Sequence, residues 1–167
     1  MFDSNINLGE VETKIAKLIN GTQNNVPLMR ILSADMHDEV EENFAQQGRP
    51  KWLGLSRATL ENRVLKRARR KGGTLKSGRV SKTAAAGAKI LQNTGQLASS
   101  ISQRYNNYTA IVGTNKVQAA MMHFGGLKSK YPHLWGDIPA RPFMSISPSG
   151  EDKLLSHTVQ YLRNLVR

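Results

Sequence analysis

The segment from residue 63 to residue 82 is the most distinctive part of this 167-residue chain, because it holds nine basic side chains and no acidic one. From residue 71 onward the segment is also rich in glycine and has no apolar face. We therefore predict a flexible basic loop over residues 71–88. The basic residues are Arg63, Lys66, Arg67, Arg69, Arg70, Lys71, Lys76, Arg79 and Lys82.

The charge of the chain is unevenly distributed. Residues 1–62 have a net charge of −3 and residues 83–167 one of +6, within a total of +12. A local positive field of this kind favours nucleic acid or an acidic protein surface. The segment has no aromatic side chain for stacking on single strands and no recognition-helix pattern, so any contact with DNA would be non-specific. A third interpretation, a solvated helix end followed by a loop, also stays open.

Length and composition indicate a single domain over residues 1–167. A hydrophobic content of 39% allows a modest core. There is no cysteine, which excludes disulfides, thiolate chemistry and cysteine-based zinc modules. No apolar run is long enough to span a membrane and no signal peptide is recognisable, so we expect a soluble protein made in the cytoplasm with no membrane partner.

Apolar periodicity predicts an α+β fold, in which several helices pack on a small, mainly antiparallel sheet. Residues 1–25 would form an N-terminal arm or a short helix at 11–19. The second predicted helix covers residues 27–47. Its outer face carries Asp35, Asp38, Glu39, Glu41 and Glu42, interpreted as a solvated face or an acidic counterpart of the basic segment. Further helices are expected from a Ser56 cap to about 68, at 94–101, 117–124 and 151–166, with a hairpin at 102–113, an irregular loop at 127–140 and a strand at 143–146.

Signs of catalysis and of cofactor binding are weak. The four histidines are scattered, and only His133 with Asp137 has a turn-like ligand spacing. After residue 62 the only acids are Asp137, Glu151 and Asp152, too few for a two-metal nuclease. Neither a phosphate-binding loop nor a Gly-x-Ser-x-Gly motif occurs. We expect no enzymatic activity, no metal and no cofactor.

Four short motifs follow one another in the second half of the chain. They are LQNTGQL at 91–97, AIVGTN at 110–115, MHFGG at 122–126 and IPARPF at 138–143. In this order and spacing they resemble the phage virion morphogenesis family, the tail completion and head-tail joining proteins of Mu-like and related tailed phages. The resemblance covers about residues 27–165, including the segment around Trp52.

The resemblance implies a non-enzymatic structural subunit of a phage or prophage virion, assembled in the host cytoplasm. It implies a homo-oligomeric ring, expected to be a hexamer, that completes the tail and joins it to the head. The expected partners are tail-tube and neck or connector proteins, with non-specific contact to passing DNA. A stand-alone, non-specific nucleic-acid-binding protein acting through residues 63–82 is the alternative.

Individual motif residues have physical interpretations of their own. Glycines at 95 and 113 would allow backbone conformations that side chains obstruct, and the pair at 125 and 126 would permit a sharp exit after an aromatic residue. Two prolines stiffen the segment that presents Arg141, which would contact a partner or hydrogen-bond its own loop. His123 with Phe124 would face a partner or be packed. The predicted assembly residues are Gly95, Leu97, Gly113, His123, Phe124, Gly125, Gly126, Pro139, Arg141, Pro142 and Phe143.

Overall fold

The computed structural model describes residues 8–70, 87–134 and 136–167, with the side chains of residue 8 and residues 66–70 left out. The predicted basic loop therefore lies almost entirely outside the described residues. Contacts divide the chain into two compact units. The first contains residues 8–39, 102–113 and 146–167, and the second contains residues 40–101 and 114–145. The prediction of a single domain stays a prediction.

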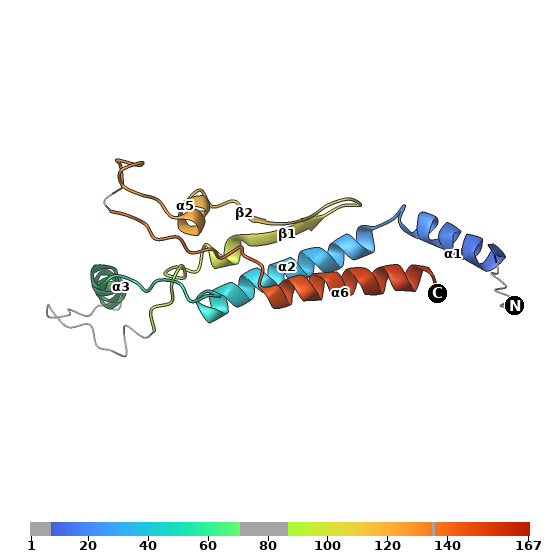
Figure 1. Cartoon of the computed structure of the whole chain (residues 1–167). Helices are drawn as coiled ribbons and strands as arrows, with labels where there is room; N and C mark the ends of the chain where they lie inside the picture. Colours follow the sequence, from blue (N-terminus) through green and yellow to red (C-terminus); the bar gives the residue numbers. More distant parts are fainter. Residues whose placement is uncertain (1–7, 71–86, 135) are drawn as a thin grey trace, which may run out of the picture. The chain divides into compact units, whose positions relative to one another are not determined.

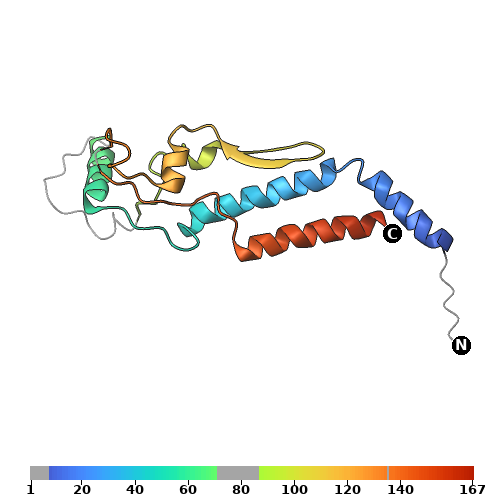
Figure 2. The ribbon, with the colours of Figure 1, turned by 45° about the horizontal axis from the view of Figure 1, so that its top comes forward.

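The first unit is built from α1 (Leu8–Gly21), most of α2 (Val26–Gln46), α6 (Pro148–Leu165) and the hairpin of β1 (Ile101–Tyr105) and β2 (Ala110–Thr114). The strands form a two-stranded antiparallel sheet that lies along α2, while α6 runs beside α2 (Figure 1, Figure 2). The predicted α+β class is confirmed, as are the hairpin and the helices at both ends. None of the described helices is long and apolar enough to cross a membrane.

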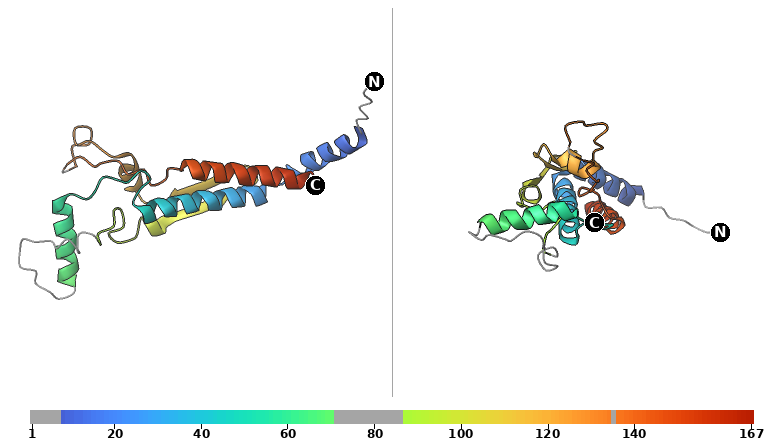
Figure 3. Two further views of the ribbon diagram at one scale, coloured as in Figure 1. Left: turned by 60° about the horizontal axis from the view of Figure 1, so that its bottom comes forward. Right: turned by 90° about the vertical axis from the view of Figure 1, so that its left-hand side faces the viewer.

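Helix α6 begins earlier than the sequence predicts because Ser147 caps it. The Ser147 hydroxyl accepts a hydrogen bond from Gly150 N at 3.1 Å, and Pro148 occupies the first turn. The Glu39 carboxylate of α2 in turn accepts from Ser147 N and Oγ, at 3.0 and 2.8 Å. One acidic side chain thus fixes the start of α6 against α2, and the two helices run antiparallel (Figure 3).

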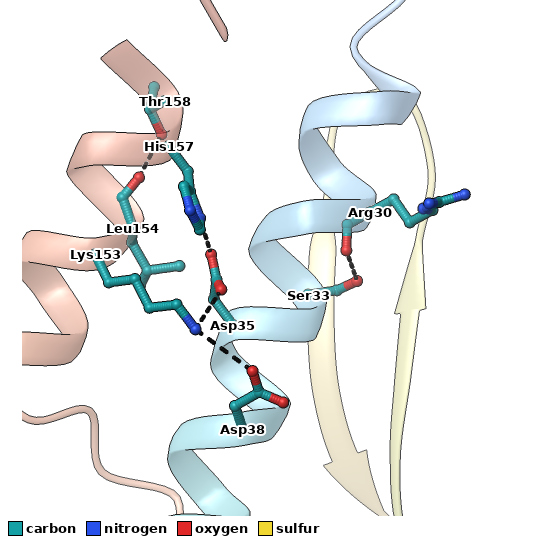
Figure 4. A network of polar contacts seen from close by, with 8 residues as sticks. All are labelled: Arg30, Ser33, Asp35, Asp38, Lys153, Leu154, His157 and Thr158. Atoms are coloured by element: carbon teal, nitrogen blue, oxygen red, sulfur yellow. Dashed lines mark hydrogen bonds and ion pairs between the residues drawn. The ribbon is translucent and has the colours of Figure 1, made fainter. Parts of the chain in front are cut away.

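Asp35 and Glu39 were predicted on a solvated outer face of α2, and this prediction is wrong. The Asp35 side chain is buried, with one oxygen 2.8 Å from Lys153 Nζ and the other 2.6 Å from His157 Nδ1. Both partners project from α6, and Lys153 also reaches Asp38 at 3.4 Å (Figure 4). Burial alone would raise the pKa of Asp35, but the hydrogen bonds from Lys153 and His157 lower it below 3.8.

The Asp35 cluster gives a pH-dependent prediction. Replacing Asp35 by asparagine is expected to lower the free energy of unfolding by about 2 kcal/mol at neutral pH, because hydrogen bonds between charged groups are lost. Since the pKa of Asp35 is lower in the folded state, its contribution is complete above pH 4 and disappears as the pH falls further. Urea unfolding of wild type and variant between pH 2 and 7 should show two curves that converge in acid. A constant difference would contradict the assignment.

Two other sequence predictions are corrected in the first unit. Apolar spacing in the sequence predicts Leu155 and Leu162 on the inner face of α6, but both are exposed. The same spacing predicts Ile31 on the buried face of α2, but it is exposed as well, whereas Ser33, on another side of the helix, is buried and donates to Arg30 O at 2.9 Å. The buried face of α2 is therefore partly polar, which a search for apolar periodicity misses.

The second unit contains the end of α2, α3 (Arg57–Arg70), a 3₁₀ turn η1 (Ala98–Ser100) and α5 (Ala119–Phe124). The predicted Ser56 cap is confirmed, since Ser56 Oγ accepts from Thr59 N at 3.3 Å. The helix predicted at 94–101 is reduced to η1, because Leu91 and Gly95 have φ of +59° and +75° and Ile101 already begins β1. No strand forms at 143–146, where the backbone carbonyls of Phe143 and Ser145 are hydrogen-bonded by a side chain instead.

Aromatic rings form the core of the second unit. Phe143 is fully buried, with its ring 5.4 Å from that of Phe44 and 5.3 Å from that of His123. Phe44 also meets Trp52 edge-on at 5.9 Å. These rings come from α2, the segment after α2, α5 and the segment 138–143, so they hold together parts of the chain that are distant in sequence.

Candidate functional site

The second half of the MHFGG motif forms a sharp exit from α5. Gly125 has φ of +76°, and a Cβ there would lie 2.8 Å from the backbone N of Ala140 and O of Ile138. Gly126 exchanges both backbone hydrogen bonds with Ile138, at 2.9 and 2.8 Å. Because only glycine tolerates this close approach, the motifs at 122–126 and 138–143 pack directly on each other.

The rest of the two motifs reinforces this pairing. Arg141 N donates to Met122 O at 3.0 Å, and Met144 N donates to His123 Nδ1 at 3.4 Å. Burial of the imidazole lowers the pKa of His123, which keeps this nitrogen an acceptor at neutral pH. Phe124, the next residue, has 76% of its surface exposed. Of the two aromatic residues in MHFGG, one is therefore packed and the other faces solvent.

A groove of about 600 Å³ lies where these motifs meet. Its walls carry large apolar side chains that are open to solvent, including Leu53, which is 68% exposed, and Phe124. Exposed apolar surface concentrated in a concave site is typical of protein interaction sites. The lining residues are Leu53, Phe124, Gly125, Gly126, Leu127, Lys130, Tyr131, Asp137, Ile138, Pro139 and Ala140.

A buried guanidinium contacts two residues of the groove. Arg141 is 7% exposed, and it donates weakly to Pro139 O at 3.5 Å and to Leu53 O at 3.4 Å. Its Nε has no hydrogen-bond partner among the described residues. Burial and the nearby positive charge of Arg63 both lower the pKa of Arg141. The guanidinium thus links two residues that line the groove, without a carboxylate to balance its charge in the described structure.

Other predicted assembly residues lie outside the groove. Leu97 is buried in the second unit, and Gly95 has positive φ as expected of its motif. The expectation for Gly113 is wrong, because it lies in β2 with ordinary φ and a Cβ there would meet no atom within 4 Å. The proposed ligand pair His133 and Asp137 is not joined: the carboxylate of Asp137 accepts from Lys128 N at 2.7 Å, and His133 stacks edge-on with Tyr131.

The basic segment is only partly described. Arg63 donates from Nη1 to Lys89 O at 2.8 Å. Lys66, Arg67, Arg69 and Arg70 lie in the last turns of α3, where side chains are not described, and Lys71, Lys76, Arg79 and Lys82 lie outside the described residues. Whether the segment contacts DNA or protein stays a prediction.

Sequence reasoning did not assign Leu53, Leu127 and Tyr131 to a site. All three are exposed, apolar or aromatic, and located in segments without helical or alternating periodicity. Such residues in a loop rich in glycine and proline are a usable signal, because a loop with no role in binding is normally polar.

The two motifs that pair at the groove, at 122–126 and 138–143, are two of the four sequence motifs on which the family resemblance depends. The model of the phage virion morphogenesis family matches residues 6–163 of this chain. The chain belongs to the phage virion morphogenesis family. The resemblance stated from the four motifs is thereby confirmed, and membership assigns this family member a structural role in phage particle assembly and associates it with the virion.

Two phage or prophage proteins are similar in sequence to this virion morphogenesis protein. It is 30% identical over 161 residues to the Mu-like prophage FluMu G protein 2 of Haemophilus influenzae, covering 96% of this chain and 95% of the relative. It is 37% identical over 65 residues to the putative capsid assembly protein G of Escherichia phage Mu, covering 39% and 41% of the two chains. No solved structure matches significantly. The family points to a structural rather than catalytic role.

Proposed function

We propose that this protein is a ring-forming subunit at the head-tail junction of a tailed phage or prophage particle, where it completes the tail and joins it to the head. Its membership of the virion morphogenesis family supports a role in assembly. The observation that carries the proposal is the exposed apolar groove, built by the motifs of residues 122–126 and 138–143. A surface of this kind is a mark of a site that another molecule covers.

The proposed assembly is a homo-oligomeric ring, expected to contain six subunits, in contact with tail-tube and neck or connector proteins. A ring arises when two different surfaces of one subunit meet with a rotation that closes. The basic segment would then face either passing DNA or an acidic surface of a neighbour. A DNA contact predicts an affinity that falls with salt, with a logarithmic slope of about 0.9 per phosphate neutralised.

Loss of the gene tests the proposal. Induction of a phage or prophage that lacks it should yield complete heads and separate tails that stay unjoined, as counted by electron microscopy. Wild-type protein supplied in trans should restore joined particles, and plaque titre should fall at least about a hundredfold without it. A role in capsid assembly, which the name of the Mu relative suggests for that protein, predicts missing or aberrant heads instead. That outcome would refute head-tail joining.

A further inference from the structure

Helix α1 presents an apolar stripe that the described residues leave about half exposed. Val11, Ile15 and Ile19 recur every four residues, which places them on one side of the helix, and all three are exposed. A different part of the helix is held by α6. Lys17 Nζ donates to Arg167 O at 3.2 Å, and a Cβ at Gly21 would lie 2.6 Å from the Leu165 side chain. The first unit therefore anchors α1 and leaves its stripe open to solvent.

The joint that precedes α2 also limits the direction of α1. Asn107, in the turn of the hairpin, accepts from Asn25 N at 2.5 Å and donates to Gln23 O at 2.9 Å. Tyr161 of α6 donates to Asn24 O at 2.9 Å. Each residue from 23 to 25 thus has a backbone atom that is hydrogen-bonded to another element. A helix presented in one direction loses less conformational entropy when it binds.

The groove of the second unit has matching apolar chemistry and a positive field. Lys130 lines it, Arg141 donates to the backbone carbonyls of Leu53 and Pro139, and Arg63 is close to Arg141. The one acid in its lining, Asp137, already accepts a backbone hydrogen bond. The sequence from residue 63 to residue 136 has no Asp or Glu, so little negative charge from this part of the chain opposes the guanidinium groups.

The N-terminal part of the chain has the opposite charge. Residues 1–13 contain three acids and no Lys or Arg. Glu10 pairs with Lys14 at 3.0 Å, whereas Glu12 lies at the edge of the stripe beside Ile15 and Ile19 and has no described partner. An amphipathic helix with this arrangement matches an apolar groove that has a positive wall.

Building on the self-assembly in the proposed function, we propose that α1 of a second copy occupies the groove, with its apolar stripe on Leu53 and Phe124 and Glu12 toward Arg63. The two surfaces differ, so each copy offers one helix and one groove, and the contact repeats from copy to copy. DNA is a poor occupant, because the walls are apolar and the Arg141 guanidinium is buried.

Substitution of each surface, followed by light scattering, tests the proposal. Ile15→Asp and Phe124→Asp should each convert a multimeric wild type into a monomer, because each buries a carboxylate in an apolar contact. Thr13→Asp, on the opposite side of α1, and Val117→Asp, at a side chain that is 96% exposed, should leave the mass unchanged. Circular dichroism verifies that all four variants fold.

A mixture of the two disruptive variants identifies a contact between copies. Ile15→Asp retains a functional groove and Phe124→Asp retains a functional helix, so together they can form one contact. The mixture should have the mass of two subunits and grow no further. A mixture that remains monomeric would overturn the proposal. It would indicate that α1 binds within its own chain or binds no groove.

Charge reversal tests the polar part. Glu12→Arg and Arg63→Glu should each raise the protein concentration needed for assembly at least about tenfold. The double variant should recover most of the lost assembly. Absence of recovery would refute this pairing.

The outcome also separates this inference from the proposed function. If Ile15→Asp still assembles into a multimer and joins particles, the placement of α1 is wrong and the head-tail role stands. If the wild-type protein is monomeric at every concentration, the contact between copies is refuted, while the gene-loss experiment decides the role in the particle independently.

Discussion

Replacing Phe143 by alanine is expected to lower the free energy of unfolding by about 3–5 kcal/mol. The side chain is fully buried, and its ring contacts those of Phe44 and His123, so truncation removes apolar contacts and leaves a cavity among parts of the chain that are distant in sequence. A loss of this size is a large fraction of the 5–15 kcal/mol typical of a whole protein. We expect partial unfolding at 37 °C and poor solubility.

Phe124→Ala provides the matched control for this prediction. The residue type and the truncation are the same, but Phe124 is mostly exposed, so the free energy of unfolding should change by less than about 0.5 kcal/mol. Denaturant unfolding followed by tryptophan fluorescence measures both variants, because Trp52 lies against Phe44. Equal losses for the two variants would show that Phe143 is not the centre of the core.

Replacing Asn43 by leucine is expected to lower the free energy of unfolding by about 2–4 kcal/mol. Asn43 is 1% exposed and donates from Nδ2 to the carbonyls of Phe143 and Ser145, at 3.0 and 2.7 Å. Its Oδ1 accepts from Arg49 Nε at 3.0 Å. Leucine has nearly the same volume but satisfies none of these groups, so two backbone carbonyls lose a hydrogen-bond donor and Arg49 Nε loses this acceptor.

Two further variants separate hydrogen bonding from helix propensity at residue 43. Gln46→Leu, at an exposed position of the same helix, should be nearly neutral. Asn43→Asp keeps the acceptor for Arg49 but turns a carboxylate toward the two carbonyls, so it should be at least as destabilising as Asn43→Leu at neutral pH. A harmless Asn43→Asp would contradict the hydrogen-bond assignment.

The helices were predictable from sequence where local patterns determine them. The apolar stripe of α2, the Ser56 cap of α3 and the asparagine turn of the hairpin depend on neighbours a few residues apart. Asp35 was misassigned because its partners, Lys153 and His157, lie more than a hundred residues away. A helical pattern cannot distinguish an acid facing solvent from one facing a second helix that provides cations.

The motif residues of the candidate site could be predicted from sequence, but their arrangement in space could not. The motifs at 122–126 and 138–143 were identified, and glycine chemistry indicated a sharp turn between them. Their pairing through Gly126 and Ile138 depends on the path of the intervening loop, which has no periodicity. The contribution of Leu53 to the groove depends on how the segment after α2 folds back, and the backbone carbonyl of that residue reaches Arg141 across 88 positions of sequence.

The ties between Asn107, Tyr161 and the residues before α2 have a geometric consequence for a head-to-tail assembly. In the proposed assembly they would limit the angle at which one copy extends its first helix, and that angle would contribute to the rotation from each subunit to the next. A rotation that divides evenly into a full circle closes a ring, and any other rotation gives an open helix. The curvature of the assembly would thus depend in part on a few hydrogen bonds at the base of α1, far in sequence from the groove that receives it.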